Sequence, residues 1–145
     1  MKLLPVLTVV VLVPALATAD SAVDGPAAAR RTNAENFKDR VLATCIAAAY
    51  KDAPPAAADA AATASALNEW AYVDLQRAGA APDALVDRFL RRDYRNPTEG
   101  YANARFDLLK CLDLYHSREL EAQARAFVPH PDWLGDKPPK RESRR

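Results

Sequence analysis

The distribution of apolar positions along the chain predicts helices and no strands. From Thr32 to about Tyr50, apolar side chains recur at helical spacing and cover one half of a helical wheel, with Cys45 near the centre of that face. Thr32 and Glu35 form a capping-box pattern at the start of this segment. No run in the chain alternates apolar and polar residues with the period of two that a half-buried strand requires. The pattern therefore favours an all-α fold.

Four more helical segments follow, separated by proline, glycine and polar residues. The second is expected over about 56–77, with an alanine-rich first half and an aromatic second half, and Gly79 is a natural C-terminal stop. The remaining three are expected over about 82–92, 103–116 and 118–127. The chain is thus expected to form a compact bundle of about five helices.

The segment over 103–116 is the most apolar of the five, and we expect it at the centre of the bundle. The side chains on its broad apolar face, expected to point inward, are Leu108, Leu109, Cys111, Leu112 and Tyr115. The charged ridge expected to face solvent is formed by Asp107, Lys110 and Asp113.

Composition adds a constraint on the core. The chain has 145 residues, enough for one domain, and 31 of them are alanine. Alanine favours helices, but each alanine side chain buries little apolar area. A domain built in this way needs close helix packing, a covalent link or a partner surface.

The first residues have the pattern of a secretory signal peptide. A short basic start is followed by an apolar stretch over 3–16 and by a small-residue cleavage site, so cleavage is expected after Ala19. The alternative is an uncleaved anchor, although the apolar stretch is shorter than the roughly 20 residues that a membrane span requires. Residues 20–31 are expected to be a flexible leader, 32–135 the helical domain and 136–145 a disordered basic tail.

Two cysteines remain in the exported chain, Cys45 and Cys111. An exported protein meets an oxidising compartment, so an even pair predicts a disulfide that links the first and fourth helical segments. The alternative is a pair of buried free thiols.

The other side chains offer no catalytic or metal-binding pattern. His116 lies at the end of a predicted helix, His130 lies between two prolines, and neither has a second ligand at metal-binding spacing. The formal net charge is only +1, which gives no reason to expect nucleic-acid binding. We therefore expect a protein that is not an enzyme and holds no cofactor or metal, and that binds a partner.

One region stands out as a candidate contact surface, the polar stretch between the third and fourth helical segments. It combines arginine and tyrosine, the residue types enriched at binding hot spots. The alternative is a solvated face of mixed charge. The candidate partner-binding residues are Arg91, Tyr94, Arg95, Asn96, Glu99 and Tyr101.

Four segments together resemble a known family. They are NFKDRVLATCIAAAY at 36–50, ATASALNEWAYVDL at 62–75, RDYRNP at 92–97 and RFDLLKCLDLYHSREL at 105–120. In this order they resemble the type VI secretion amidase immunity proteins, in the family that neutralises the fourth class of amidase effectors. The run KCLDLYHS, which unites the second cysteine with a Tyr-His pair and a helix cap, is the most specific part.

The resemblance implies a periplasmic, all-helical homodimer that binds an incoming peptidoglycan amidase, a papain-like cysteine peptidase, at its active-site cleft. Kin and producer cells would be protected because the amidase is blocked before it cuts the cell wall. No membrane insertion is expected after signal cleavage. The alternatives are a periplasmic helical adaptor or chaperone-like protein with no effector partner, and a small secreted enzyme.

Overall fold

A computed structural model describes residues 25–94, 101 and 104–138 of the protein. The expected signal peptide, residues 1–19, lies outside these residues, as do residues 20–24 of the leader and 139–145 of the tail. Nowhere in the described part of the chain is a helix both long enough and apolar enough to cross a membrane.

The described residues form helices joined by short connections, and none of these residues belongs to a strand. This confirms the predicted all-α class. In chain order the elements are a 3-10 turn η1 (Ala27–Arg30), α1 (Asn33–Ala49), α2 (Pro54–Ala66), α3 (Asn68–Ala71), α4 (Leu75–Ala78), α5 (Ala81–Leu90), α6 (Asp107–Tyr115) and α7 (Arg118–Phe127).

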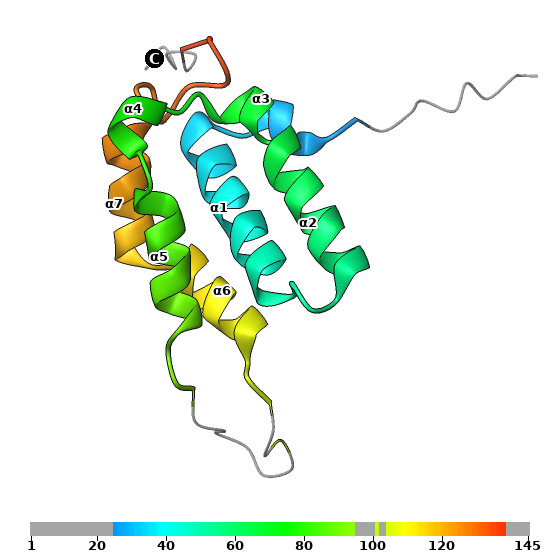
Figure 1. Ribbon diagram of the computed structural model, residues 1–145. Helices are drawn as coiled ribbons and strands as arrows, with labels where there is room; N and C mark the ends of the chain where they lie inside the picture. The colour runs from blue at the N-terminus through cyan, green and yellow to red at the C-terminus, as the bar shows by residue number, and fades with distance from the viewer. Residues whose placement is uncertain (1–24, 95–100, 102–103, 139–145) are drawn as a thin grey trace, which may run out of the picture.

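Helix α1 lies between α2 on one side and the group formed by α5, α6 and α7 on the other (Figure 1). The core forms where α1 meets that group, so it draws on helices that are distant in the sequence. Its buried residues are Phe37, Val41, Cys45, Leu85, Val86, Phe89, Cys111, Leu114, Leu120, Ala124 and Val128. By contrast, α2 buries little beyond Ala60, as its alanine-rich sequence leads one to expect.

The start of α1 is set by the predicted capping box. The Thr32 hydroxyl accepts a hydrogen bond from the Glu35 backbone N–H at 3.2 Å, and the Glu35 carboxylate accepts one from the Thr32 backbone N–H at 2.7 Å. The hydrogen bond from the Thr32 backbone N–H is the main reason why the pKa of Glu35 lies below its ordinary 4.5.

A C-terminal segment over 130–135 covers the first turn of α1. Two backbone N–H groups that the helix leaves without intrahelical partners, those of Asn33 and Ala34, donate to the carbonyls of Trp133 and Pro131 at 2.8 and 3.0 Å. The Asn33 side chain, fully buried, also bonds the backbone of Gly135 through both its amide nitrogen and its oxygen. The C-terminal segment is therefore part of the folded domain.

The predicted second helix is divided into α2, α3 and α4. The first boundary lies at Leu67, between α2 and α3, and the second at Tyr72, whose φ of 44° places it in the left-handed region and ends α3. Long-range hydrogen bonds hold the two sides of this break: the Asn36 side chain donates to the Trp70 carbonyl, and the Asp74 backbone N–H donates to the Phe127 carbonyl. These bonds replace the intrahelical bonds that a continuous helix would make.

Candidate functional site

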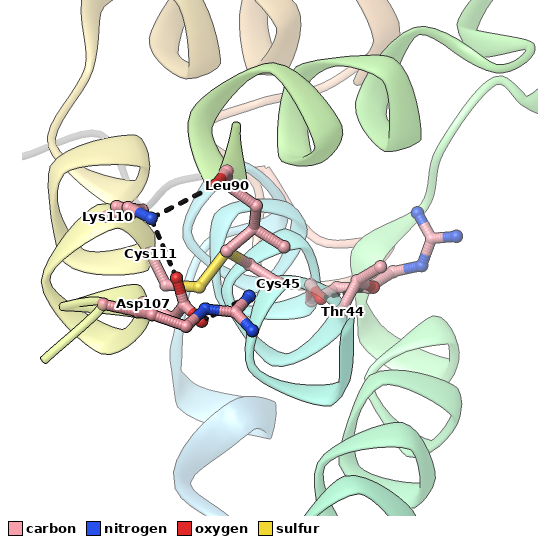
Figure 2. Close-up of a disulfide and its surroundings, with 8 residues drawn as sticks. Thr44, Cys45, Leu90, Asp107, Lys110 and Cys111 are labelled. Atoms are coloured by element: carbon pink, nitrogen blue, oxygen red, sulfur yellow. Dashed lines mark hydrogen bonds and ion pairs between the residues drawn. A yellow bond between two sulfur atoms is a disulfide. The ribbon is translucent and has the colours of Figure 1, made fainter. Parts of the chain in front are cut away.

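The two cysteines form the predicted disulfide, which links α1 to α6. The Cα atoms of Cys45 and Cys111 lie 5.7 Å apart, and neither residue has exposed surface. Figure 2 shows the bridge passing from Cys111 on α6 to Cys45 on α1, beside the C-terminal end of α5 at Leu90. The link fixes α6 against the core.

The orientation of α6 differs from the predicted one. Leu108, Leu109 and Leu112 are 44%, 41% and 41% exposed, whereas Lys110 is only 6% exposed. The expectation that these leucines point inward and that Lys110 is solvated was wrong. Cys111 and Leu114 mark the buried face, and at 100° per residue Lys110 falls on the same half of the helix while the three leucines fall on the other half. We call the three leucines, together with the neighbouring Tyr50, the leucine face.

Beside the leucine face, the surface is hollowed into a pocket of about 450 Å³. Residues of the chain entering α6 form one wall and Tyr50 forms another. An exposed apolar surface of this kind is typical of a contact site for another protein.

The buried Lys110 joins the end of α5 to the start of α6. Its Nζ atom donates to the Leu90 carbonyl at 3.2 Å and to the Asp107 carboxylate at 2.9 Å (Figure 2). Arg105 also pairs with Asp107, at 2.9 Å. Between α5 and α6 the chain runs through the predicted contact region, so these bonds hold both of its ends.

Tyr94 adds a second connection between the same two parts of the chain. Its hydroxyl donates to the Asp113 carboxylate of α6 at 2.5 Å, and its ring lies 5.9 Å from the Lys110 ammonium. Burial of the ring, followed by the hydrogen bond to Asp113, raises the pKa of Tyr94 above its ordinary 10.0, so the hydroxyl remains a donor at neutral pH.

The candidate partner-binding residues divide into two groups. Arg91 lies exposed directly after α5, Tyr94 is partly buried against α6, and Tyr101 is 58% exposed. The other three, Arg95, Asn96 and Glu99, lie outside the described residues. The end of α5 and the start of α6 lie at the same end of the molecule, the lower end in Figure 1.

A larger groove of about 830 Å³ runs between α1 and α2 and was not predicted. Apolar side chains such as Leu42 and Trp70 line it, and a polar cluster lies on its wall, where Arg31 and the Tyr115 hydroxyl both donate to the Asp39 carboxylate. Burial, together with the negative charge of Asp39, raises the pKa of Tyr115. No local signal in the sequence places these residues together, because they come from three separate elements.

The two histidines make aromatic contacts. His130 stacks on Trp133 with ring centroids 3.9 Å apart, and His116 meets the edge of Tyr115. Among the described residues, no group of three or more His, Cys, Asp or Glu side chains is arranged to hold a metal ion.

The solved structures that resemble the chain include the following two. One is a chain from a structure of new type VI-secreted toxins and self-resistance proteins of Serratia marcescens, with a TM-score of 0.66 and 25% identity over 80% of this chain and 93% of that chain. The other is a chain from the effector–immunity system Tae4/Tai4 of Salmonella typhimurium, with a TM-score of 0.60 and 25% identity over 70% of this chain and 95% of that chain. No curated protein matches the chain.

A family-wide sequence profile gives the most direct assignment. The profile describes Tai4, the type VI secretion system amidase immunity protein, and it matches residues 35–124. This span runs from the first turn of α1 almost to the end of α7, and it includes the disulfide, the leucine face and the chain between α5 and α6. The profile match agrees with the family resemblance that the KCLDLYHS run indicated. The chain belongs to the Tai4 family of type VI secretion system amidase immunity proteins.

Proposed function

We propose that this protein inhibits a type VI-secreted peptidoglycan amidase by placing the chain between α5 and α6 against the active-site cleft of that enzyme. The observation that carries the proposal is the family match over residues 35–124. As a member of this family the chain is an immunity protein, and inhibition by binding needs no catalytic group of its own. In this proposal the amidase is a papain-like cysteine peptidase, and the immunity protein is not an enzyme.

The contact residues that we propose are the six candidates of the α5–α6 connection. Support comes from the exposure of Arg91 and Tyr101 and from the preference of binding hot spots for arginine and tyrosine. The remaining proposed contacts are Tyr94, Arg95, Asn96 and Glu99.

The test is a titration of the mature protein into a purified Tae4-class amidase from the same strain, with peptidoglycan hydrolysis as the measurement. A tight inhibitor removes activity in proportion to the amount added and abolishes it at one immunity chain per amidase. Hydrolysis that continues unchanged at a large excess of the protein would contradict the proposal. Hydrolysis by the protein alone would contradict its assignment as a non-enzyme.

We further propose that the protein acts in the periplasm after cleavage between Ala19 and Asp20. The N-terminal sequence has the parts of a signal peptide, and a disulfide forms and persists in an oxidising compartment. N-terminal sequencing of the protein from a periplasmic extract should begin at Asp20. A protein that keeps Met1 and remains in the cytoplasmic fraction would contradict this placement.

We also propose that the protein is a homodimer and that the second copy covers the leucine face. Three leucines on one side of α6, each about two fifths exposed, leave an apolar surface that water disfavours. A second copy of the chain would bury this surface and add apolar contact area to a chain that is rich in alanine.

Replacement of Leu112 by aspartate is expected to weaken self-association at least about tenfold, because it places an unpaired charge in the buried part of the interface. Size-exclusion chromatography with light scattering measures the mass over a range of concentrations. The matched control is Leu75→Asp, since Leu75 is 69% exposed and lies on α4. A Leu112→Asp protein that remains as dimeric as the control would show that the second copy binds elsewhere.

A further inference from the structure

Lys110 is the one charged residue among the buried residues of the described chain. Its side chain is 7% exposed and that of its partner Asp107 is 11% exposed. Replacing a buried ion pair by apolar side chains of similar size is often neutral or stabilising, so a buried pair is weak support for a role in stability alone. A role in holding two elements in one arrangement is the better-attested use of such a pair.

The contacts of Lys110 join the two ends of one connection. The Leu90 carbonyl belongs to the last residue of α5, where helix carbonyls lack intrahelical partners and the helix dipole is negative. The Lys110 ammonium donates a hydrogen bond to this carbonyl and places a positive charge at the negative end of the dipole. Asp107 is the first residue of α6, where the dipole favours a negative charge. One ammonium group thus binds the end of the helix before the connection and the start of the helix after it.

Nearby contacts act on the same two ends. The Tyr94 hydroxyl bonds Asp113, and Arg105 pairs with Asp107. All of these bonds meet on α6, which the disulfide at Cys111 attaches to α1. Figure 2 shows Lys110 between Leu90 and Asp107, one position before the bridged cysteine. The ends of the connection are therefore attached to a helix that the disulfide holds against the core.

We propose that Lys110 is a positioning residue for inhibition: it fixes the separation and direction of the two ends of the α5–α6 connection, so that the free protein already holds these ends as they lie in the complex with the amidase. This inference rests on the proposed function of that connection. Preorganisation strengthens binding because less conformational freedom is lost when the complex forms. Without the ammonium, only a fraction of the free protein holds the binding arrangement. The apparent dissociation constant then equals the intrinsic constant divided by that fraction, so it rises as the fraction falls.

The test compares Lys110→Met with the wild-type exported chain, both with the disulfide intact. Methionine keeps the unbranched shape and removes the charge. We expect the melting temperature to stay within about 4 °C of wild type, because the packing is kept and Asp107 keeps its 2.9 Å pair with Arg105. We expect amide hydrogen exchange to become faster at Arg91, Arg92 and Ala104, whose backbone N–H groups donate bonds at the two ends of the connection. We expect the dissociation constant for the same strain's amidase to rise about tenfold.

Two further variants separate positioning from a general loss of structure. Lys110→Arg keeps donors that reach Leu90 and Asp107, and it should retain binding within about threefold of wild type. Lys38→Met is the matched control, because Lys38 also bridges two helices through its 3.3 Å pair with Glu121 and is 22% exposed, but it lies on α1 facing α7. The control should change neither the exchange at the three amides nor the dissociation constant.

The outcomes distinguish the proposal from the function on which it rests. Unchanged exchange at the three amides in Lys110→Met would overturn the positioning role, whether or not the amidase is inhibited. Faster exchange with an unchanged dissociation constant would also overturn it. Failure of the wild-type protein to inhibit would refute the proposed function alone. If Lys110→Met does not fold, Asp107→Asn removes the paired charge with little change in size, and unchanged exchange and binding in that variant would refute the role.

Discussion

Loss of the Cys45–Cys111 disulfide is expected to lower the free energy of unfolding by about 4 kcal/mol. The bridge joins residues that are 66 positions apart, so the unfolded chain without it gains the freedom of a long open loop. The free energy of unfolding of a single domain is commonly only about 5–15 kcal/mol. In this protein the core is formed by residues of four helices, and the disulfide links two of them, α1 and α6. Loss of the bridge should therefore remove a large share of the stability.

Urea unfolding of the double variant Cys45→Ala/Cys111→Ala, compared with the oxidised wild type, measures this loss. Wild-type protein treated with a reductant is the matched control and should lose a similar amount, since it keeps both cysteine side chains. A loss below about 1 kcal/mol in both samples would show that the unfolded chain gains little freedom or that the bridge strains the folded protein.

The second large effect is expected on inhibition. The double variant Arg95→Ala/Tyr101→Ala should weaken inhibition of the amidase about a hundredfold or more, because truncation of an arginine or tyrosine hot spot commonly costs at least about 2 kcal/mol. Tyr101 is 58% exposed and makes no side-chain hydrogen bond within the described residues, so its replacement should leave the fold intact. The inhibition constant is measured on peptidoglycan, with thermal unfolding as the check on folding.

The control for this variant is Tyr72→Ala/Arg77→Ala. Both residues are exposed and of the same types, but they lie around α4, at the opposite end of the molecule from the α5–α6 connection (Figure 1). This control should inhibit as the wild type does. If the Arg95→Ala/Tyr101→Ala protein also inhibits as the wild type does, the amidase contacts another surface, and the leucine face and the groove between α1 and α2 become the next candidates.

Several boundaries and contacts were predictable because they depend on residues close together in the sequence. The Thr32–Glu35 capping box begins α1, and Ser117 caps α7 by accepting from the Leu120 backbone N–H at 3.1 Å. Gly79, with a φ of 48°, ends α4. The disulfide followed from the even number of cysteines in a chain that is expected to be exported. Each of these features could be predicted because it depends on hydrogen bonds between residues close in the sequence or on the residue composition of the chain.

The division of the 56–77 segment was not predictable, because no proline or glycine within it signals the break at Tyr72. The break is imposed by bonds to residues far away in the sequence, from Asn36 to the Trp70 carbonyl and from the Asp74 amide to the Phe127 carbonyl. The placement of the C-terminal segment against α1 also depends on long-range contacts, since the Asn33 side chain donates a hydrogen bond to the carbonyl of Gly135, 102 positions away. Helical periodicity cannot report such contacts.

The sequence by itself determined the all-α class, the helix caps, the disulfide pair and, through the KCLDLYHS run, the family. Only the tertiary structure decided which side of α6 is buried. The helix is apolar over so wide an arc that its own pattern fits several rotations, and the contacts around Cys111 select the one that buries Lys110 and exposes Leu112. That selection creates both the leucine face and the ionic link at the base of the α5–α6 connection, because burial depends on neighbours that the local sequence does not contain.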